Sequence, residues 1–413
     1  MVECWLPYGN TEVHVSVPIR NLLGIVEVEV EAVKEPEKEI IQAIQNPQST
    51  NTLTNMVRRG EKIAVALEGD LPSPHIGFIV ELIIKELLEA KINPKDISII
   101  VSPGSFGSIR KDLRDQLTIL DKTGIKFIQH SWTKKDTISV GEEKEVTIHI
   151  NKGFMEADIR VLIGEVKPDL LTGYSGGPSI LFPCLSDKKS IETVLKEYSD
   201  VDSWFSVLEG NPVYETSRKL TQLLNIDFSV NMVSDTKNNL THIIVGELED
   251  SWNKAVKLVE EIFKVKLERG DIFLISAGGY PYDRTLYNAS KAIETISKYL
   301  GKNTKIILLA ECSEGIGDSS FTKYLTEYND VRNMRRQLKR KWELGGEMAY
   351  RMRNTLSDHQ FTLVSILPDN LAKPLNINVR RTATNALNHV NRLSRKDSKV
   401  VVIPFGALTI PVS

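Results

Sequence analysis

The chain has 413 residues and is nearly neutral, with 52 lysines and arginines against 54 aspartates and glutamates and a formal net charge of −2 at pH 7. This balance excludes a global field that would recruit nucleic acid or an anionic membrane, and it favours a small-molecule ligand. At roughly 100 to 200 residues per domain, the length predicts two or three domains, and we expect two large lobes.

The cysteines and the first residues indicate the compartment. Cys4, Cys184 and Cys312 lie far apart, so they offer neither a disulfide framework nor a paired CxxC metal site. Glu3 and Pro7 stand where a signal peptide needs an unbroken apolar region, and no stretch has 18 uncharged apolar residues. We therefore expect a cytoplasmic protein that does not span a membrane.

Short β-rich runs, each followed by a turn and a helical pattern, recur along the chain. They cover residues 62–70, 97–105, 159–166, 272–279 and 306–318. Between the first two, a helix is predicted over 76–91, because Ile79, Ile83 and Leu87 recur at four-residue steps. The alternation predicts an α/β fold with mostly parallel sheets flanked by helices. Ligands of such sheets bind beyond the carboxyl ends of the strands, where the polar turns of this sequence are concentrated.

The expected domain boundary lies in the segment 266–273, where a long charged helical pattern ends at Gly270 and a new strand begins. We therefore predict an N-terminal domain over residues 1–268, a C-terminal domain over 269–413, and a cleft between them.

The first candidate binding turn is "GYSGGPSILFPC", residues 173–184. The adjacent Gly176 and Gly177 permit positive φ and a close backbone approach to a ligand, so Gly173, Ser175, Gly176 and Gly177 are predicted binding residues. The alternative is a turn that holds no ligand, because glycine turns after strands are common. A second turn of this kind, "SAGGYPYDRTLYNASK", covers residues 276–291.

Three polar residues near these turns are further candidates. Lys291 and Asn288 stand three residues apart on one helix face, so both can point at one small anion; the alternative for Lys291 is an ordinary solvated charge. Asp70 ends the apolar strand in "EGDLPSP", and its alternative role is a helix cap or an Asx turn.

Other polar residues argue against particular chemistries. None of the seven histidines lies between residues 150 and 241, so we expect no nickel or zinc site around the first glycine turn. His75 and His130 lie near candidate loops, where a structural role is the commoner one. Cys312 stands between two glutamates that disfavour its thiolate, and it is not proposed as a nucleophile. The basic segment 331–346 is expected to form a solvated helix face.

Six segments together resemble the nickel-pincer lactate racemase family, in the same order and across nearly the whole chain. They are "EGDLPSP", "VSPGS", "IGEVKPDLLTGYSGG", "SAGGYPYDRTLYNASK", "ECSEGIGD" and "KWELGGEMA". The resemblance implies two α/β domains and interconversion of the enantiomers of a 2-hydroxy acid. It also implies a nickel-carrying pyridinium mononucleotide that is joined to a lysine by a thioamide and exchanges a hydride with the substrate, while two histidines move the hydroxyl proton.

The sequence departs from this family pattern at five positions. Ser179 stands where the family has the tethering lysine, and a serine cannot form the thioamide. Phe106 and Asp169 match the two proton-transfer histidines, Leu195 falls near the nickel-ligating histidine, and Ser73 replaces an arginine. Because of this departure at Ser179, we expect no covalently attached cofactor here.

The positions that carry over from the family are predicted pocket residues: Asp70, Gly173, Gly176, Gly177, Asn288, Lys291 and Trp342, with Asn288 in place of a glutamine.

Two hypotheses for the function remain. The chain is either a 2-hydroxy acid racemase or epimerase with altered residues, in which Lys291 and Asp169 serve catalysis if burial raises the pKa of Asp169. Or it is a catalytically silent relative that binds a small carboxylate or nucleotide, or pairs with a true racemase.

Overall fold

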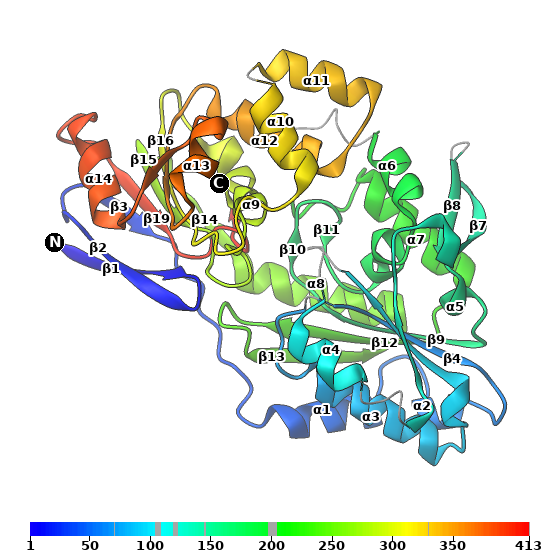
Figure 1. Ribbon diagram of the computed structural model, residues 1–413. Helices are drawn as coiled ribbons and strands as arrows, with labels where there is room; N and C mark the ends of the chain where they lie inside the picture. The colour runs from blue at the N-terminus through cyan, green and yellow to red at the C-terminus, as the bar shows by residue number, and fades with distance from the viewer. Residues whose placement is uncertain are drawn as a thin grey trace. The chain divides into compact units, whose positions relative to one another are not determined.

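The computed structural model describes residues 1–69, 71–103, 109–118, 123–143, 146–196, 205–328 and 330–412. The chain forms two compact units (Figure 1). Unit 1 combines residues 1–29 with 263–413, and unit 2 is the continuous segment 30–262. The predicted α/β class, with parallel sheets flanked by helices, is confirmed.

The compact units do not follow the predicted consecutive division into residues 1–268 and 269–413. The first 29 residues belong to unit 1 because the strand β3 (Leu22–Ile25) pairs in parallel with β19 (Val400–Ile403). The preceding hairpin of β1 (Val2–Tyr8) and β2 (Thr11–Val17) packs into the same core as β19. This pairing joins Leu22 to Val400, at opposite ends of the chain, and no local pattern around β3 indicates it.

Unit 2 is built on a six-stranded sheet with the order β13-β12-β9-β4-β5-β6. Its strands are β4 (Ile63–Glu68), β5 (Ile97–Ser102), β6 (Lys126–Gln129), β9 (Ile159–Glu165), β12 (Phe228–Ser234) and β13 (Leu240–Gly246). Only β13 runs antiparallel to its neighbour in this sheet. The chain adds strands outward from β4 on one side and from β9 on the other, so the strand order reverses between β4 and β9. Such a reversal point is where open α/β sheets bind ligands.

Helices cover both faces of this sheet. They are α1 (Pro36–Gln45), α2 (Leu53–Met56), α3 (Ile76–Glu89), α4 (Lys111–Thr118), α5 (Lys152–Met155), α6 (Lys188–Lys196), α7 (Pro212–Leu224) and α8 (Leu248–Phe263). The predicted helix over 76–91 is confirmed as α3, and its stripe of Ile79, Ile83 and Leu87 is fully buried against the strands with α1 and α4. Smaller ladders join β7 (Thr137–Glu143) to β8 (Val146–Asn151) and β10 (Pro168–Asp169) to β11 (Gly173–Tyr174).

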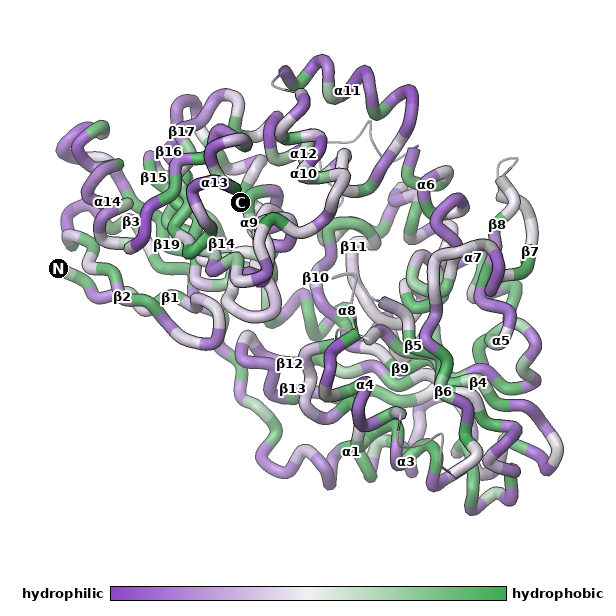
Figure 2. Tube along the Cα trace, viewed as in Figure 1, coloured by the Kyte–Doolittle hydropathy of each residue, from purple (hydrophilic) through white to green (hydrophobic). Residues whose placement is uncertain are grey.

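Unit 1 has a second six-stranded sheet, entirely parallel, with the order β18-β17-β16-β15-β19-β3. Its other strands are β15 (Ile272–Ser276), β16 (Lys305–Leu309), β17 (Gln360–Val364) and β18 (Asn378–Arg380). Figure 2 shows β15 and β16 as hydrophobic segments, as expected for strands that are buried on both faces. The strand order reverses between β15 and β19.

The helices of unit 1 are α9 (Leu286–Ile296), α10 (Ser319–Glu327), α11 (Val331–Arg340), α12 (Leu344–Leu356), α13 (Asp369–Ala372) and α14 (Ala383–Arg392). A short ladder joins β14 (Lys264–Lys266) to β20 (Ile410–Val412). In α11, Met334 and Leu338 are buried while the arginines and lysines are exposed, which is the solvated basic face that the sequence predicts. Among the described residues, no helix has the length and hydropathy needed to cross a membrane.

A buried acid in α9 makes the stability of unit 1 depend on pH. Burial raises the pKa of Glu294 from 4.5 to about 7, with a smaller raising effect from Glu347 and opposing effects from Arg351 and from the hydroxyl of Thr355. The Thr355 hydroxyl donates to Glu294 Oε1 over 3.1 Å. Because the folded state holds this proton more tightly than the unfolded chain, its contribution to stability is complete below about pH 4.5 and is lost as the pH rises to about 7.

We therefore expect the Glu294→Gln variant to lose less stability than the wild type between pH 4.5 and pH 7. The pKa difference between 4.5 and about 7 corresponds to a free-energy difference on the order of 3 kcal/mol. Thermal unfolding at half-unit pH steps measures it, with the exposed Glu268→Gln as the control. If the melting temperatures of the wild type and Glu294→Gln changed in parallel with pH, the expectation would be contradicted.

Candidate functional site

The first glycine turn lies at the point in unit 2 where the strand order reverses. After β9, the chain makes the short β10–β11 hairpin and returns to Ser175, whose hydroxyl donates to the Glu165 carbonyl over 2.8 Å. The backbone N–H of Lys167 donates to Ser175 Oγ over 3.1 Å, and the N–H of Ser175 donates to the Lys167 carbonyl. Ser175 thus fixes the turn to the end of β9.

The glycines of this turn are required by the packing of the protein itself. Gly176 and Gly177 have φ values of +71° and +48°, and a Cβ on Gly177 would lie 2.3 Å from Cδ1 of Trp252. A Cβ on Gly173 would lie 2.4 Å from the Val207 carbonyl oxygen. Contacts within the protein therefore explain these glycines without a bound ligand, as in the alternative of a turn that holds no ligand. Their binding role stays a prediction.

Ser179, at the family's lysine position, is buried against an acidic side chain. Its hydroxyl lies 3.0 Å from the Gly176 carbonyl and 3.4 Å from Glu68 Oε1. The thiol of Cys184 lies 3.6 Å from the same oxygen. Glu68 is the last residue of β4 and is only 4% exposed. Sequence reasoning missed Glu68, although a glutamate that ends a fully apolar strand is a usable signal.

The loop after β4 is contacted by the guanidinium of Arg110, which the sequence patterns do not indicate as a site residue. Asp70 lies outside the described residues, as does Phe106. Ser73 is fully buried and its hydroxyl accepts from the N–H of His75 over 3.3 Å. Arg110, which precedes α4, donates through Nη1 to the Leu71 carbonyl at 2.6 Å and to the Ser73 carbonyl at 3.4 Å. A guanidinium therefore lies at the loop where the family arginine is replaced by Ser73.

Asp169 has a structural role in the β10–β11 hairpin. Its Oδ1 accepts from the N–H groups of Leu171 and Thr172, both at 2.8 Å, and from the Thr172 hydroxyl at 3.0 Å. These contacts form an Asx turn, which explains an aspartate at this place without catalysis. Its predicted acid/base role is not tested by these contacts and stays a prediction.

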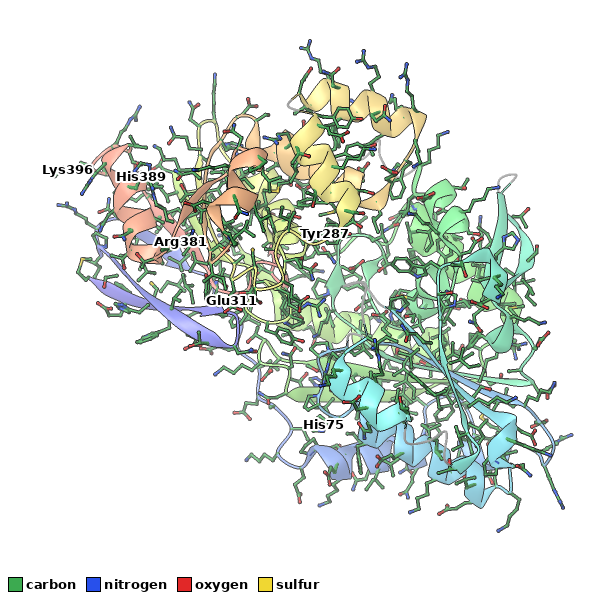
Figure 3. The ribbon with its side chains drawn as sticks, in the orientation of Figure 1. His75, Tyr287, Glu311, Arg381, His389 and Lys396 are labelled. Atoms are coloured by element: carbon green, nitrogen blue, oxygen red, sulfur yellow. The ribbon has the colours of Figure 1, made fainter. Side chains whose placement is uncertain are left out.

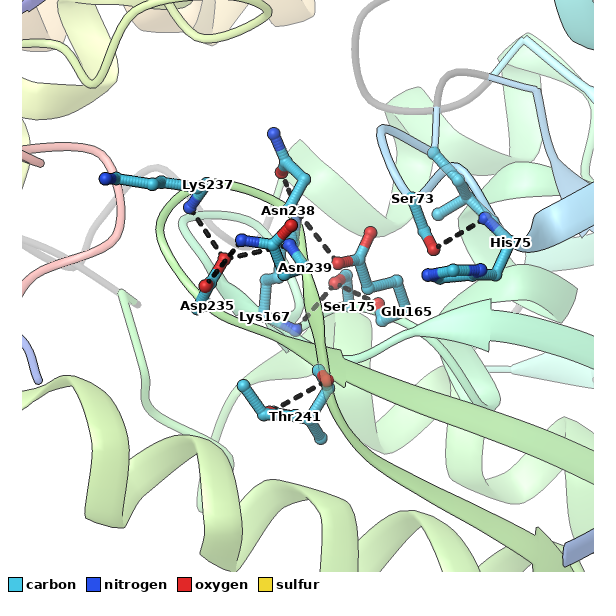
Figure 4. A network of polar contacts seen from close by, with 12 residues as sticks. Ser73, His75, Glu165, Lys167, Ser175, Asp235, Lys237, Asn238, Asn239 and Thr241 are labelled. Atoms are coloured by element: carbon cyan, nitrogen blue, oxygen red, sulfur yellow. Dashed lines mark hydrogen bonds and ion pairs between the residues drawn. The ribbon is translucent and has the colours of Figure 1, made fainter. Parts of the chain in front are cut away.

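A buried ion pair lies at the end of β9, where the sequence patterns do not indicate it. Lys167 Nζ lies 3.1 Å from Glu165 Oε1, and the two side chains are 10% and 0% exposed. The Lys167 ammonium also donates to Asn238 Oδ1 over 3.2 Å, which joins it to the turn between β12 and β13. Figure 4 shows Glu165 between this turn and the Ser73–His75 loop.

The described side chains around the turn do not fit the tethered nickel cofactor that the family resemblance implies. Ser179 has no amine, and Leu195, near the position of the nickel-ligating histidine, is fully buried in α6. Within the parts of the chain that the structure describes, no three His, Cys, Asp or Glu side chains are grouped for a metal ion. His130 is structural, because its ring nitrogens contact the Ser186 carbonyl at 3.1 Å and the Asn151 amide at 3.0 Å. Its burial lowers its pKa.

The second glycine turn, in unit 1, is organised by Asp283. This side chain is fully buried, and its Oδ2 accepts from the N–H of Gly9 at 2.7 Å and from that of Glu311 at 3.1 Å. Gly9 is the tip of the β1–β2 hairpin, and Glu311, which Figure 3 labels, lies in the segment after β16. Burial is the main cause that raises the pKa of Asp283. One carboxylate thus joins three segments at the carboxyl edge of the sheet.

The remaining predicted residues of unit 1 lie in and around α9 and α12. The Thr285 side chain caps α9, accepting from the N–H of Asn288 and donating to its Oδ1. Asn288 is 2% exposed and its Nδ2 has no hydrogen-bond partner among the described residues, while Lys291 follows one turn later and is partly buried. Trp342 is 5% exposed and its Nε1 also lacks a partner within the described chain.

Cys312 is not set up as a nucleophile, as the sequence indicates. Burial raises the pKa of its thiol to about 12, with smaller raising effects from Asp283 and Glu311. At neutral pH its thiolate is therefore not populated.

The chain is a protein of two α/β units, each with glycine-rich turns at the carboxyl ends of parallel strands, the position at which proteins of this class bind their ligands. The chain matches the lactate racemase N-terminal domain over residues 8–198 and the lactate racemase C-terminal domain over residues 265–410. It therefore belongs to the lactate racemase family.

Individual relatives match over nearly their whole lengths. A lactate racemase of Thermoanaerobacterium thermosaccharolyticum is 24% identical over 99% of both chains, and one of Lactiplantibacillus plantarum is 22% identical over 98% of this chain and 99% of its own. The solved lactate racemase apoprotein of T. thermosaccharolyticum has a TM-score of 0.87 at 23% identity and full coverage of both chains. A Thermotoga maritima protein has a TM-score of 0.66 at 14% identity, covering 94% of this chain and 100% of its own. These structural similarities establish a shared fold.

Proposed function

We propose that this member of the lactate racemase family binds a small 2-hydroxy acid at a divergent active site and carries no covalently tethered nickel-pincer nucleotide. The observation that carries the proposal is Ser179, because the family's lysine position holds a buried hydroxyl that lies against Gly176 and Glu68. The curated relatives named lactate racemase supply the substrate class. Among the described residues the three cysteines are buried and form no disulfide, which supports the expected cytoplasmic location.

The absence of a tethered cofactor predicts the mass of the protein. When the chain is produced together with the cofactor-building enzymes, we expect an intact mass equal to that of the sequence, because Ser179 offers no amine for a thioamide. We also expect no nickel that survives dialysis. An added mass of nucleotide size, or stoichiometric nickel that disappears in Cys184→Ala, would contradict the proposal.

Lys291 is the proposed carboxylate-binding residue of unit 1. A lysine ammonium supplies a compact charge for an anion, and Asn288, one turn before it, has a buried amide with no partner among the described residues. If Lys291 is the residue that holds the ligand carboxylate, Lys291→Ala weakens the binding of lactate or malate by about 1.5 to 3 kcal/mol, the cost of a charged hydrogen bond. Calorimetric titration measures this, with the exposed Lys298→Ala as the control. Equal affinities in the wild type and Lys291→Ala would make Lys291 an ordinary solvated lysine.

The second candidate is a catalytically silent member that binds a carboxylate or nucleotide, or pairs with a true racemase. The contacts of Asp169 favour it, because three hydrogen bonds to Oδ1 already give this side chain a structural role. Incubation of the purified chain with one enantiomer of lactate in deuterated water separates the two candidates. An isomerase produces the other enantiomer, whereas a silent member binds lactate and leaves its configuration unchanged.

A further inference from the structure

The Glu165–Lys167 pair is the most deeply buried ionic feature at the carboxyl edge of the unit 2 sheet that has no assigned role. Glu165 is 1% exposed and Lys167 is 8% exposed as whole residues. A buried ion pair is stable only when the remaining hydrogen-bonding capacity of both groups is also satisfied. The hydrogen-bond partners around Glu165 and Lys167 therefore decide whether the pair is purely structural.

The carboxylate of Glu165 is incompletely satisfied. Oε1 lies 3.1 Å from Lys167 Nζ, within ion-pair distance, but neither Oε1 nor Oε2 has a hydrogen bond of acceptable angle among the described residues. The ammonium of Lys167, in contrast, also donates to Asn238 Oδ1. A buried carboxylate oxygen without a donor is costly, and a ligand that brings a donor removes that cost.

The pair lies where the topology places a ligand. Strand β9 is beside β4, at the reversal of strand order, with Ile163 opposite Leu67. Since side chains alternate along a strand, Glu165 lies on the same face as Ile163 and Leu67, which is the face covered by α3. In the view of Figure 4 the Ser73–His75 loop, which leads into the 14-residue helix α3, is drawn next to Glu165, and the N-terminus of a helix favours an anion.

We propose that the Glu165–Lys167 pair of unit 2 is the element that recognises the 2-hydroxy acid, an inference that rests on the proposed function and assigns the ligand carboxylate to Lys167 in place of Lys291. A 2-hydroxy acid carries a hydroxyl donor and a carboxylate on neighbouring carbons. The pair offers the complement, an acceptor oxygen beside an ammonium. The ligand hydroxyl donates to Glu165, the ligand carboxylate pairs with Lys167, and the Lys167–Asn238 bond is exchanged for the bond to the ligand. No proton or other group is transferred.

The test is calorimetric titration of the full-length chain with lactate and with propionate, which lacks the hydroxyl. For Lys167→Met we expect both affinities to fall at least about tenfold, because the carboxylate loses its cation. For Glu165→Gln we expect the preference for lactate over propionate to fall at least about tenfold, while propionate binding is retained. Lys237→Met, an exposed lysine of the neighbouring turn, is the control and should bind as the wild type does.

A structural role would give a different pattern, because a misplaced turn lowers the affinities for lactate and propionate together in Glu165→Gln. Lys167→Met leaves a buried carboxylate unpaired, so the double variant Glu165→Gln/Lys167→Met provides a folded protein without either charge, checked by its melting temperature. Unchanged lactate affinity in that double variant would overturn the inference. If that affinity instead depended on Lys291, the proposed function would stand. A wild type that binds no 2-hydroxy acid would overturn both.

Discussion

Replacing Gly177 with alanine is expected to destabilise unit 2 by about 2 to 5 kcal/mol. The new Cβ would lie 2.3 Å from Cδ1 of Trp252, and the backbone has a φ of +48°, which a side chain disfavours. Trp252 cannot easily yield, because its Nε1 donates to the Ser175 carbonyl over 3.1 Å and its ring stacks on Tyr214 at a centroid distance of 5.6 Å. Overpacking and backbone strain therefore act together.

The matched control is Gly60→Ala. Gly60 also has a positive φ, +94°, but an added Cβ would meet no atom within 4 Å, so only the backbone cost of about 1 kcal/mol remains. Amide hydrogen exchange, followed by mass spectrometry on peptides from β9 and α8, reports the stability of unit 2 separately from that of unit 1. Equal losses of protection in Gly177→Ala and Gly60→Ala would show that Trp252 moves aside at little cost.

Replacing Asp283 with alanine is expected to destabilise unit 1 by about 2 to 5 kcal/mol. The change leaves the N–H groups of Gly9 and Glu311 without their acceptor, and each buried unsatisfied donor costs about 1 to 3 kcal/mol. The hairpin tip loses its attachment to the second glycine turn. In the Asp283→Ala variant we therefore expect peptides from β1 and β2 to exchange their amide hydrogens faster than peptides from β19 do.

Asp283→Asn separates the hydrogen bonds from the charge. Its amide oxygen can still accept from both N–H groups, so we expect a much smaller loss than in the alanine variant. Because burial raises the pKa of Asp283, the wild type loses part of its stability as the pH rises through that pKa, and the asparagine variant does not. Asp271→Ala, which removes one exposed bond to the N–H of Lys399, is the control. An asparagine variant as unstable as the alanine variant would contradict this assignment.

Local pattern predicted the elements of the fold well. The apolar steps of Ile79, Ile83 and Leu87 predict α3, and the β-rich runs predict β4, β5, β9 and β15, because a helix stripe or a buried strand leaves its period in consecutive residues. The order of the motifs likewise indicates the lactate racemase family, which the two domain matches confirm. The run 306–318 was predicted less well, because only 305–309 forms a strand and the polar residues after it form a loop.

The sequence by itself determined the fold class and the family, and it placed Ser179 where the family resemblance implies a lysine, because these depend on which residues stand at which positions. Tertiary structure alone decided that residues 1–29 complete unit 1, that Arg110 reaches the Ser73 loop, and that Glu165 and Lys167 form a buried pair against Asn238. It also explains Gly177 of the SGG turn, because a Cβ at this position would clash with the indole of Trp252. These contacts join residues that are distant in the chain, and their free energies come from burial and exclusion of water, which no local pattern encodes.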